Sequence, residues 1–417
     1  MRVNYSNINF NTDEYKTSLH KSEIASKSIT NEILAKNPNY GIFDYEDSYK
    51  QLQALKPIID HINNSYTDLI IISMGGATLN PQSLVQLAEK TLDQNNGIKL
   101  HFLDNTDPIY YAQLISKVNL KTTAVIAISN SGETIETISL TSAMIASFKM
   151  AGIASIKNHF YFITKQGSSS LSLLAKEIGG KIISHKENIS GRFSGFTNVS
   201  TLVATIAGVN AGEYIEGMQN TLDDFIKNPE ASKATIYAAV IMLLNKPIMI
   251  NLAYLQQFSS FLDWYNQIIA ESLGKKEKGI TPVKSLGPND QHSMLQLYLS
   301  ERNDKFYNLF YVDNLPQNIK LDSNISTKSL QHFSLSEVND INFAATKQTL
   351  EDQDKKLRSI ILNDTSARSI GQLTSNMMME TIILAKIMDI NPFDQPNVEL
   401  IKNNIRLKLL DSSSEKL

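Results

Sequence analysis

The sequence predicts an α/β protein with two tandem three-layer α-β-α sandwich domains and mainly parallel sheets. Short apolar runs alternate with longer helical stretches, the alternation restarts after residue 230, and 417 residues are enough for two domains. Strands that are apolar throughout are typical of parallel sheets covered by helices on both faces. We therefore expect an N-terminal arm over residues 1–45, a first domain over 46–230 and a second domain over 231–417.

The expected elements follow from the length and apolar character of each run. In the first domain, the predicted strands are Asp68–Ser73, Ile98–Leu103, Thr122–Ile128 and His159–Thr164, with helices at Pro81–Asp93 and Thr134–Lys149 among those between them. In the second domain, the predicted strands are Pro247–Leu252, Phe306–Val312 and Arg358–Leu362. The predicted helices there are Ala231–Leu244, Tyr254–Ser272 and Thr365–Met388, and the segment Pro396–Leu410 closes the chain.

Composition narrows the class of protein. The formal net charge of −3 gives no basic excess of the kind that nucleic-acid binding needs. The absence of cysteine excludes disulfides, cysteine nucleophiles and thiolate metal sites. The N-terminus lacks the apolar stretch of a signal peptide, and runs such as Asp68–Met74 are too short to span a bilayer. We expect a cytoplasmic protein that binds neither nucleic acid nor membrane.

The segment Ile128–Thr137, ISNSGETIET, is the most informative short motif. An apolar strand ends there, and Ser129, Ser131 and Thr134 surround a glycine before a helix begins. Unpaired N–H groups at a helix N-terminus carry partial positive charge, and added hydroxyls make the place suitable for phosphate. The alternative is an ordinary helix cap, with Asn130 as the capping residue and Glu133 completing a capping box.

Two glycine turns are further candidates for ligand binding. In SMGGATLNP, Gly75 and Gly76 allow close approach of the backbone to a ligand, although a plain tight turn is the simpler interpretation. In SGRFS, Arg192 follows Gly191 and presents a rigid fork of donors that suits an oxyanion, although a surface arginine is the simpler interpretation.

A carboxylate at the end of an apolar helical stretch is the candidate general base. Glu271 would be costly to bury unless it is paired or used, and burial favours the pKa range of a base. Gln267 lies one helical turn earlier and shares its face. His292 follows the turn Gly287–Asn289 and has no metal-ligand spacing, so a structural histidine is the simpler interpretation; Lys402 resembles a solvated helix residue.

Together, these segments resemble the glucose-6-phosphate isomerase family, whose domains have the sugar-isomerase (SIS) fold. The motifs ESLGK, GITPVKSLGPNDQHSMLQL and NPFDQPNVELIK stand in the family's order, and the resemblance extends from about residue 45 to 405. It implies interconversion of glucose 6-phosphate and fructose 6-phosphate through an enediolate in glycolysis and gluconeogenesis, with no cofactor and no metal. It also implies a homodimer in which His292 crosses the interface.

The resemblance implies a role for each matching residue. Glu271 would move the proton between C2 and C1, Arg192 would stabilise the enediolate, and His292 and Lys402 would assist opening of the sugar ring. The residues implied in substrate binding are Gly76, Ala77, Ser129, Asn130, Ser131, Thr134, Gly191, Gln267 and Gln395.

Three positions depart from the family's usual pattern. Asn130 stands where many members have lysine, Ala77 replaces a common serine, and Ser190 replaces a glycine. Two alternative functions remain: an isomerase that also accepts mannose 6-phosphate, and a non-catalytic sugar-phosphate sensor with the same fold. Retention of Glu271, Arg192, His292 and Lys402 argues against the sensor, which would need only the phosphate loop.

Overall fold

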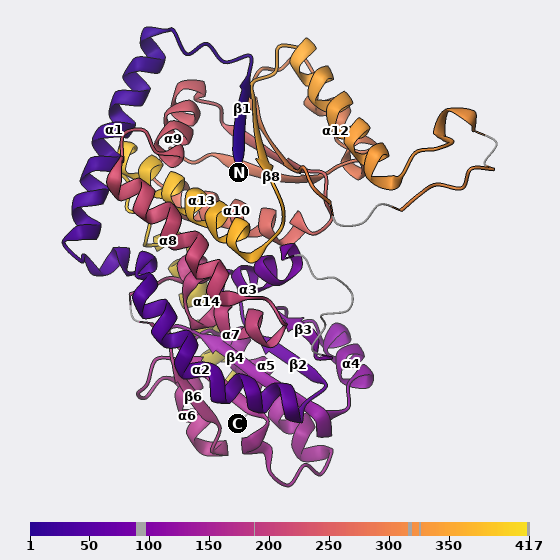
Figure 1. Cartoon of the computed structure of the whole chain (residues 1–417). Helices are drawn as coiled ribbons and strands as arrows, with labels where there is room; N and C mark the ends of the chain where they lie inside the picture. The colour runs from indigo at the N-terminus through magenta and orange to yellow at the C-terminus, as the bar shows by residue number, and fades with distance from the viewer. Residues whose placement is uncertain (89–96, 187, 316–318, 325–326, 415–417) are drawn as a thin grey trace.

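In the residues that the structure describes (1–88, 97–186, 188–315, 319–324 and 327–414), the computed structural model contains two five-stranded sheets. Each sheet is covered by helices on both faces, and the two sandwiches lie one above the other in Figure 1. The predicted α/β fold with two mainly parallel sheets is confirmed. Within these residues, no helix is both long and apolar enough to cross a membrane.

The first sheet is parallel throughout, with strand order β3-β2-β4-β5-β6. Alternate residues of β2 and β4 face opposite helical layers, so both strands are buried along their whole length. The strands are β2 (Asp68–Ile72), β3 (Lys99–Leu103), β4 (Thr123–Ser129), β5 (Phe160–Thr164) and β6 (Lys181–Ser184). One face packs against α2 (Tyr45–Ser65) and α7 (Asn198–Ile206), and the other against α4 (Pro108–Lys117), α5 (Ile135–Met150) and α6 (Ser170–Ile178).

The second sheet has the order β1-β10-β9-β7-β8, and only the β1–β10 pair is antiparallel among its described strands. Its strands are β1 (Arg2–Ser6), β7 (Ile248–Ala253), β8 (Thr281–Leu286), β9 (Lys305–Val312) and β10 (Leu357–Leu362). One face packs against α9 (Lys233–Leu244), α10 (Phe258–Leu273) and α13 (Ala367–Ile387), and the other against α11 (Leu295–Tyr298) and α12 (Leu335–Asp352).

The residues predicted as an N-terminal arm lie on the second sandwich. Strand β1 extends its sheet beside β10, with Val3 opposite Ile360. Helix α1 (Asp13–Leu34) then packs against α9 and α13, and the 3₁₀ turn η1 (Pro38–Phe43) leads to α2 in the first sandwich. The start of the chain therefore contributes to the sheet formed mainly by its second half.

The first helix after β2 begins earlier than predicted. Helix α3 covers Gly76–Leu87, and the predicted start at Pro81 is wrong because Gly75, with φ of +56°, already turns the chain into the helix. Residues 89–93 of the predicted helix lie outside the described residues. The early start places the glycine pair directly at the helix N-terminus.

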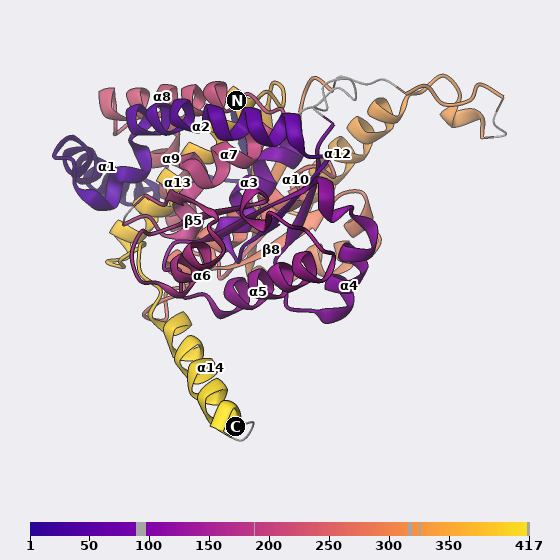
Figure 2. The ribbon, with the colours of Figure 1, turned by 90° about the horizontal axis from the view of Figure 1, so that it is seen from below.

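The two sandwiches share one apolar interface. Helices α3 and α10 pack together there, and α8 (Ala211–Lys227) packs along α13. The buried Trp264 ring of α10 donates its indole N–H to the carbonyl oxygen of Arg192 at 3.0 Å. By contrast, α14 (Pro396–Ser414) projects away from the rest of the chain (Figure 2).

An ion pair is buried inside the second sandwich. The side chains of Arg358 on β10 and Glu380 on α13 are 2% and 0% exposed. Tyr265 of α10 donates a hydrogen bond to Glu380 at 2.5 Å and accepts one from Arg358 at 3.1 Å. Burial acts against the charge of Arg358, but the attraction of Glu380 outweighs it and raises the pKa of the guanidinium. The pair thereby fixes α10 and α13 against the sheet.

Removing one member of this pair should be strongly destabilising. Arg358→Met leaves the Glu380 carboxylate buried without its cation, and we expect a loss of about 3–5 kcal/mol in the free energy of unfolding. The control is Arg368→Met, because the Arg368–Glu216 pair is 49% and 40% exposed and should contribute about 1 kcal/mol or less. Urea unfolding measures both, and equal losses would contradict a structural role for the buried pair.

Candidate active site

Parallel α/β sheets bind ligands where neighbouring strands send their connections to opposite sides. In the first sheet this happens between β2 and β4, since β3 lies on one side of the pair and β5 on the other. The loop after β2 contains Gly75 and Gly76, and the loop after β4 contains Ser129, Ser131 and Thr134. Both motifs singled out in the sequence therefore meet at one edge of the sheet.

The loop after β4 forms a compact group of hydroxyls. Ser129 Oγ lies 3.0 Å from Thr134 Oγ1 and accepts the backbone N–H of Gly132 at 3.1 Å. Ser131 Oγ accepts the backbone N–H of Glu133, also at 3.1 Å. Helix α5 begins immediately afterwards, and its N-cap, Thr134, makes no capping hydrogen bond with its side chain. The capping hydroxyl is thus not used in closing the helix.

The alternative of an ordinary capping box at α5 is not formed. The Glu133 carboxylate instead accepts hydrogen bonds from the backbone N–H and the hydroxyl of Ser170, at 2.8 and 2.7 Å, at the start of α6. Asn130 donates to the carbonyl oxygen of Ile189 at 2.5 Å, which ties this loop to the segment before Arg192. Glu133 is therefore held by a different helix, where its charge is stabilised by the N-terminus of α6.

The glycine pair, Gly75 and Gly76, lies near the turn that contains Gly191 and Arg192, called here the arginine turn. A Cβ atom on Gly76 would lie 2.3 Å from Arg192 N, and one on Gly75 would lie 3.1 Å from Gln267 Nε2. Asn80 bridges the two segments by donating to the carbonyl oxygens of Gly76 at 2.7 Å and Gly191 at 2.8 Å. Ala77 is buried in the apolar core of the first sandwich.

Arg192 occupies the centre of the candidate site and is 1% exposed. It begins the 3₁₀ helix η5 (Gly191–Phe196) together with Gly191, and each of its five N–H donors has an acceptor. Nη1 donates to Glu271 at 2.8 Å and to Gln395 at 2.9 Å. Nε donates to Ser272 at 2.9 Å, and Nη2 donates to the carbonyl oxygens of Pro392 at 2.6 Å and Asp394 at 2.9 Å. Burial lowers the pKa of Arg192, while Glu271 and Asp394 oppose that shift.

Glu271 is held from both sides in the last turn of α10. One carboxylate oxygen accepts from Arg192, and the other accepts from Gln267 Nε2 at 2.8 Å. The predicted shared face of Gln267 and Glu271 is confirmed by this bond. The Glu271 side chain keeps 23% of its surface exposed. Two buried acceptors, Gln267 Oε1 and Asn130 Oδ1, have no hydrogen-bond partner in the described part of the chain, so ligand hydroxyls could satisfy them.

The structure does not bring His292 and Lys402 to this group. The connection from α10 to β8 closes on itself, since a Cβ on Gly279 would lie 3.1 Å from Gly274 Cα. Six residues of β8 then carry the chain about 20 Å onward before η6 (Asn289–Gln291) and the exposed His292. Lys402 lies on α14, is 42% exposed and pairs with Glu399 at 2.7 Å.

Sequence reasoning missed several groups that support the site. Ser272, Trp264 and Lys275 all contact Arg192 or the segment that carries Gln395. The sequence pointed to two of these residues, because Ser272 and Lys275 belong to the ESLGK motif. Nothing in that motif identifies the groups that they contact.

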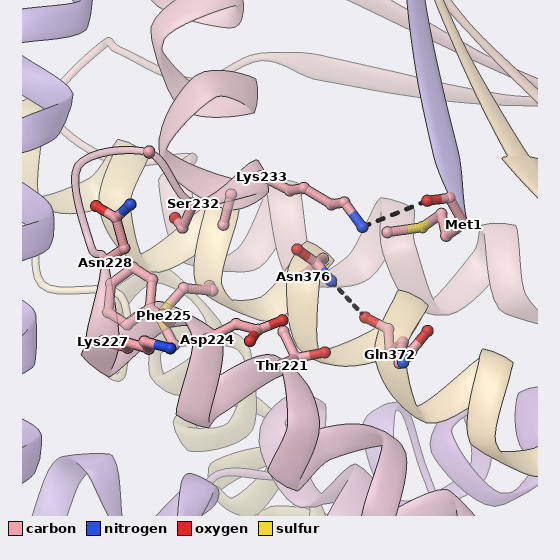
Figure 3. Close-up of a pocket in the computed structure, with 13 residues that line it drawn as sticks. Met1, Thr221, Asp224, Phe225, Lys227, Asn228, Ser232, Lys233, Gln372 and Asn376 are labelled. Atoms are coloured by element: carbon pink, nitrogen blue, oxygen red, sulfur yellow. Dashed lines mark hydrogen bonds between the residues drawn. The ribbon is translucent and has the colours of Figure 1, made fainter.

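A separate pocket lies between α8, α9, α13 and the N-terminus (Figure 3). In it, Lys233 donates to the carbonyl oxygen of Met1 at 3.3 Å, and Asn376 donates to that of Gln372 at 2.7 Å. None of its described lining residues belongs to the predicted site. The pocket is therefore separate from the predicted site.

The two-sandwich fold is shared with solved structures over most of the chain. It superimposes on a hypothetical protein of Thermus thermophilus with a TM-score of 0.89 and 23% identity, covering 98% of this chain and 100% of the other. A glucose-6-phosphate isomerase of Chlamydia trachomatis has a TM-score of 0.74 and 20% identity, covering 88% of this chain and 74% of the other. These two similarities describe the fold alone.

The sequence comparisons establish the family. Residues 51–297 match the family model described as phosphoglucose isomerase. The chain is 30% identical over 345 residues to a glucose-6-phosphate isomerase of Methanocaldococcus jannaschii, and the match covers 81% of this chain and 82% of the relative. It is 29% identical over 346 residues to one of Campylobacter jejuni, covering 80% and 83%. The chain therefore belongs to the phosphoglucose isomerase family.

The contact between Gly76 and Arg192 should tolerate no side chain. In Gly76→Ala the methyl group must displace the backbone of the arginine turn, and we expect a loss of about 1–3 kcal/mol in the free energy of unfolding. The control is Gly41→Ala, whose Cβ would meet only Lys186 Cε at 3.7 Å and should change stability by about 1 kcal/mol or less. Urea unfolding compares the two variants. Equal stability of both would show that the glycine is not required by the close approach.

Proposed function

We propose that the chain interconverts glucose 6-phosphate and fructose 6-phosphate. The observation that carries the proposal is the carboxylate of Glu271, held between Gln267 and Arg192 in the site between the two sandwiches. Membership of the phosphoglucose isomerase family supports the same reaction. We place the reaction in glycolysis and gluconeogenesis, in the cytoplasm.

Glu271 acts as the base in this proposal. It removes the proton from C2 of the open-chain aldose and returns it to C1, and the reverse reaction runs the same steps backwards. The electron pair of the broken C–H bond forms the C1–C2 double bond of an enediolate, and negative charge develops on the O1 oxygen. The hydroxyl proton on O2 then passes to O1, so that return of the proton from Glu271 to C1 leaves the C2 carbonyl of the ketose. Gln267 fixes one carboxylate oxygen, which leaves the exposed part of the carboxylate to face the sugar.

Arg192 supplies the fixed cation for the enediolate. Its Nη1 donates to Glu271 and Gln395, the two side chains that this proposal places at the substrate, so its N–H groups are the ones closest to a substrate oxygen. A cation already held in place costs no reorganisation as charge develops, which lowers the barrier. Gln395 shares Nη1 and positions the substrate beside it.

The hydroxyls of Ser129, Ser131 and Thr134 hold the 6-phosphate at the N-terminus of α5. Binding at this distance from the reacting carbons holds them against Glu271 and contributes to rate by orientation. Gly76, Ala77, Asn130 and Gly191 line or support the binding loops in the same proposal. The hydroxyl arrangement and the engagement of Glu133 by α6 favour an anion at this position.

We further propose a homodimer in which His292 assists ring opening in the neighbouring site. Within one chain, the length of β8 separates His292 from its own Glu271, and His292 is exposed in a turn from which it can reach a partner. Lys402 assists the same step in this proposal. Helix α14, which carries Lys402, projects outward from its own chain, so in this proposal it reaches the active site of the partner subunit when the dimer forms.

The decisive assay measures isomerisation of fructose 6-phosphate by the wild-type chain and by Glu271→Gln. Glutamine preserves size and hydrogen bonding but not the basic oxygen, so turnover should fall by about 10²–10⁴-fold with a smaller change in substrate binding. The wild type should also exchange deuterium from D₂O into the product. The control is Glu277→Gln on the exposed turn after α10, which should behave as wild type. Near-normal turnover and exchange in Glu271→Gln would reject this residue as the base.

Mixing two inactive variants tests the shared site. Glu271→Gln and His292→Asn chains are refolded together, so that half of the dimers are mixed. If the histidine crosses, one site of each mixed dimer carries both defects and the other is intact, and about a quarter of wild-type activity returns. If the histidine acts in its own chain, every site keeps one defect. Activity that stays at the level of the separate variants would therefore exclude the crossed arrangement.

A further inference from the structure

The segment from Asn391 to Gln395 has no regular secondary structure, yet it delivers Gln395 to the candidate site. It connects the end of α13 to the outward-projecting α14. A segment of this kind needs external contacts to hold a side chain in one position. We propose that Lys275 is a positioning residue that fixes the 391–395 segment and thereby places Gln395 beside Arg192 and Glu271.

The three ammonium donors of Lys275 all find acceptors on this segment. Nζ donates to the carbonyl oxygen of Asn391 at 2.5 Å and to that of Asp394 at 2.7 Å. It also pairs with Asp394 Oδ1 at 2.7 Å, and its side chain is only 11% exposed. All three N–H donors of the lysine are directed at the 391–395 segment rather than at Glu271 or Gln267. The contacts therefore describe a positioning residue and not a catalytic one.

Lys275 and Arg192 both donate hydrogen bonds to the 391–395 segment. The carbonyl oxygen of Asp394 accepts from Lys275 Nζ at 2.7 Å and from Arg192 Nη2 at 2.9 Å. Arg192 comes from the first sandwich, whereas Lys275 follows directly after the helix that carries Glu271. The segment is thus fixed relative to both the oxyanion-binding cation and the base. Without Lys275, the segment keeps the hydrogen bonds of Arg192 and the ring contacts of Phe393, but loses its polar link to the end of α10.

The neighbouring lysines show what is particular to Lys275. Lys276 and Lys278 donate to the carbonyl oxygens of Asp389 and Met388, both at 2.7 Å, at the end of α13. Carbonyls at a helix C-terminus lack partners within the helix, and cations there are a common way to end it. Both lysines are exposed, and among the hydrogen bonds of the described residues neither donates to residues 391–395. They are matched controls on the same turn.

The test begins with Lys275→Met and the control Lys276→Met. Hydrogen exchange of the ligand-free proteins should become faster in Lys275→Met alone at the amides of Asn391 and of residues 393–395, since Pro392 has no amide hydrogen. If the methionine variant does not fold, Lys275→Gln takes its place. Unchanged exchange in the segment, or the same increase in Lys276→Met, would overturn the proposal. This measurement does not depend on the activity of the protein.

A double-mutant cycle then asks whether Lys275 acts through Gln395, which rests on the proposed isomerase function. Lys275→Met should lower kcat/KM about tenfold to a hundredfold, since small displacements of positioning groups have effects of this size. The same change should have little further effect in a Gln395→Ala background. Lys275→Arg, which keeps the charge, should recover part of the loss.

Full additivity of the two changes would exclude action through Gln395. An inactive wild-type chain would instead reject the proposed isomerase function, and the exchange measurement would still decide the role of Lys275.

Discussion

The buried guanidinium of Arg192 is the contact on which the site between the two sandwiches depends. Moving a charge of this kind out of water costs several kcal/mol unless hydrogen bonds and an opposite charge compensate it. All five N–H donors are compensated, and every acceptor lies in the second half of the chain: Ser272, Glu271, Gln395 and two backbone carbonyls of the 392–394 segment. If the turn that contains Arg192 separated from the second sandwich, the guanidinium would lose all five of these hydrogen bonds. The same hydrogen bonds therefore fix the geometry of the site and hold the two sandwiches together.

The hydrogen bonds of Arg192 fall into two groups, one structural and one directed at the site. Nε and Nη2 hold Ser272 and the backbone of the 392–394 segment, so they serve the structure. Nη1 faces the carboxylate of Glu271 and the amide of Gln395, which are also the groups that contact the sugar in the proposed reaction. The glycine at position 76 is a consequence of the same arrangement, since a side chain there would collide with the backbone that carries the arginine. A rigid cation beside a partly exposed carboxylate is the arrangement that the proposed proton transfer through an enediolate requires.

The interior strands of both sheets could be predicted from the sequence, but only one of the four edge strands, β3, was predicted. The seven predicted strands include every interior strand of both sheets, because burial on both faces leaves a continuous apolar run. The three strands that the prediction omitted, β1, β6 and β8, all lie at sheet edges. Each has exposed or half-exposed positions, such as Lys181 in β6 and Thr281 in β8, that interrupt the apolar pattern. The antiparallel direction of β1 depends on pairing with β10, which lies far along the chain and which no local pattern encodes.

In the site, too, contacts between residues close in sequence could be predicted, whereas contacts between distant residues could not. Gln267 and Glu271 were predicted to meet because one helical turn fixes their geometry, and they do meet. The partners of Arg192 and Lys275 could not be predicted, because backbone carbonyls accept hydrogen bonds without any side-chain signature. A run such as Lys275–Lys278 looks like a solvated charged turn in sequence, yet its first lysine is nearly buried and fully bonded. What the sequence lacks is therefore the tertiary path that brings the end of α13 back to the end of α10, and that path converts an ordinary charged turn into part of the site.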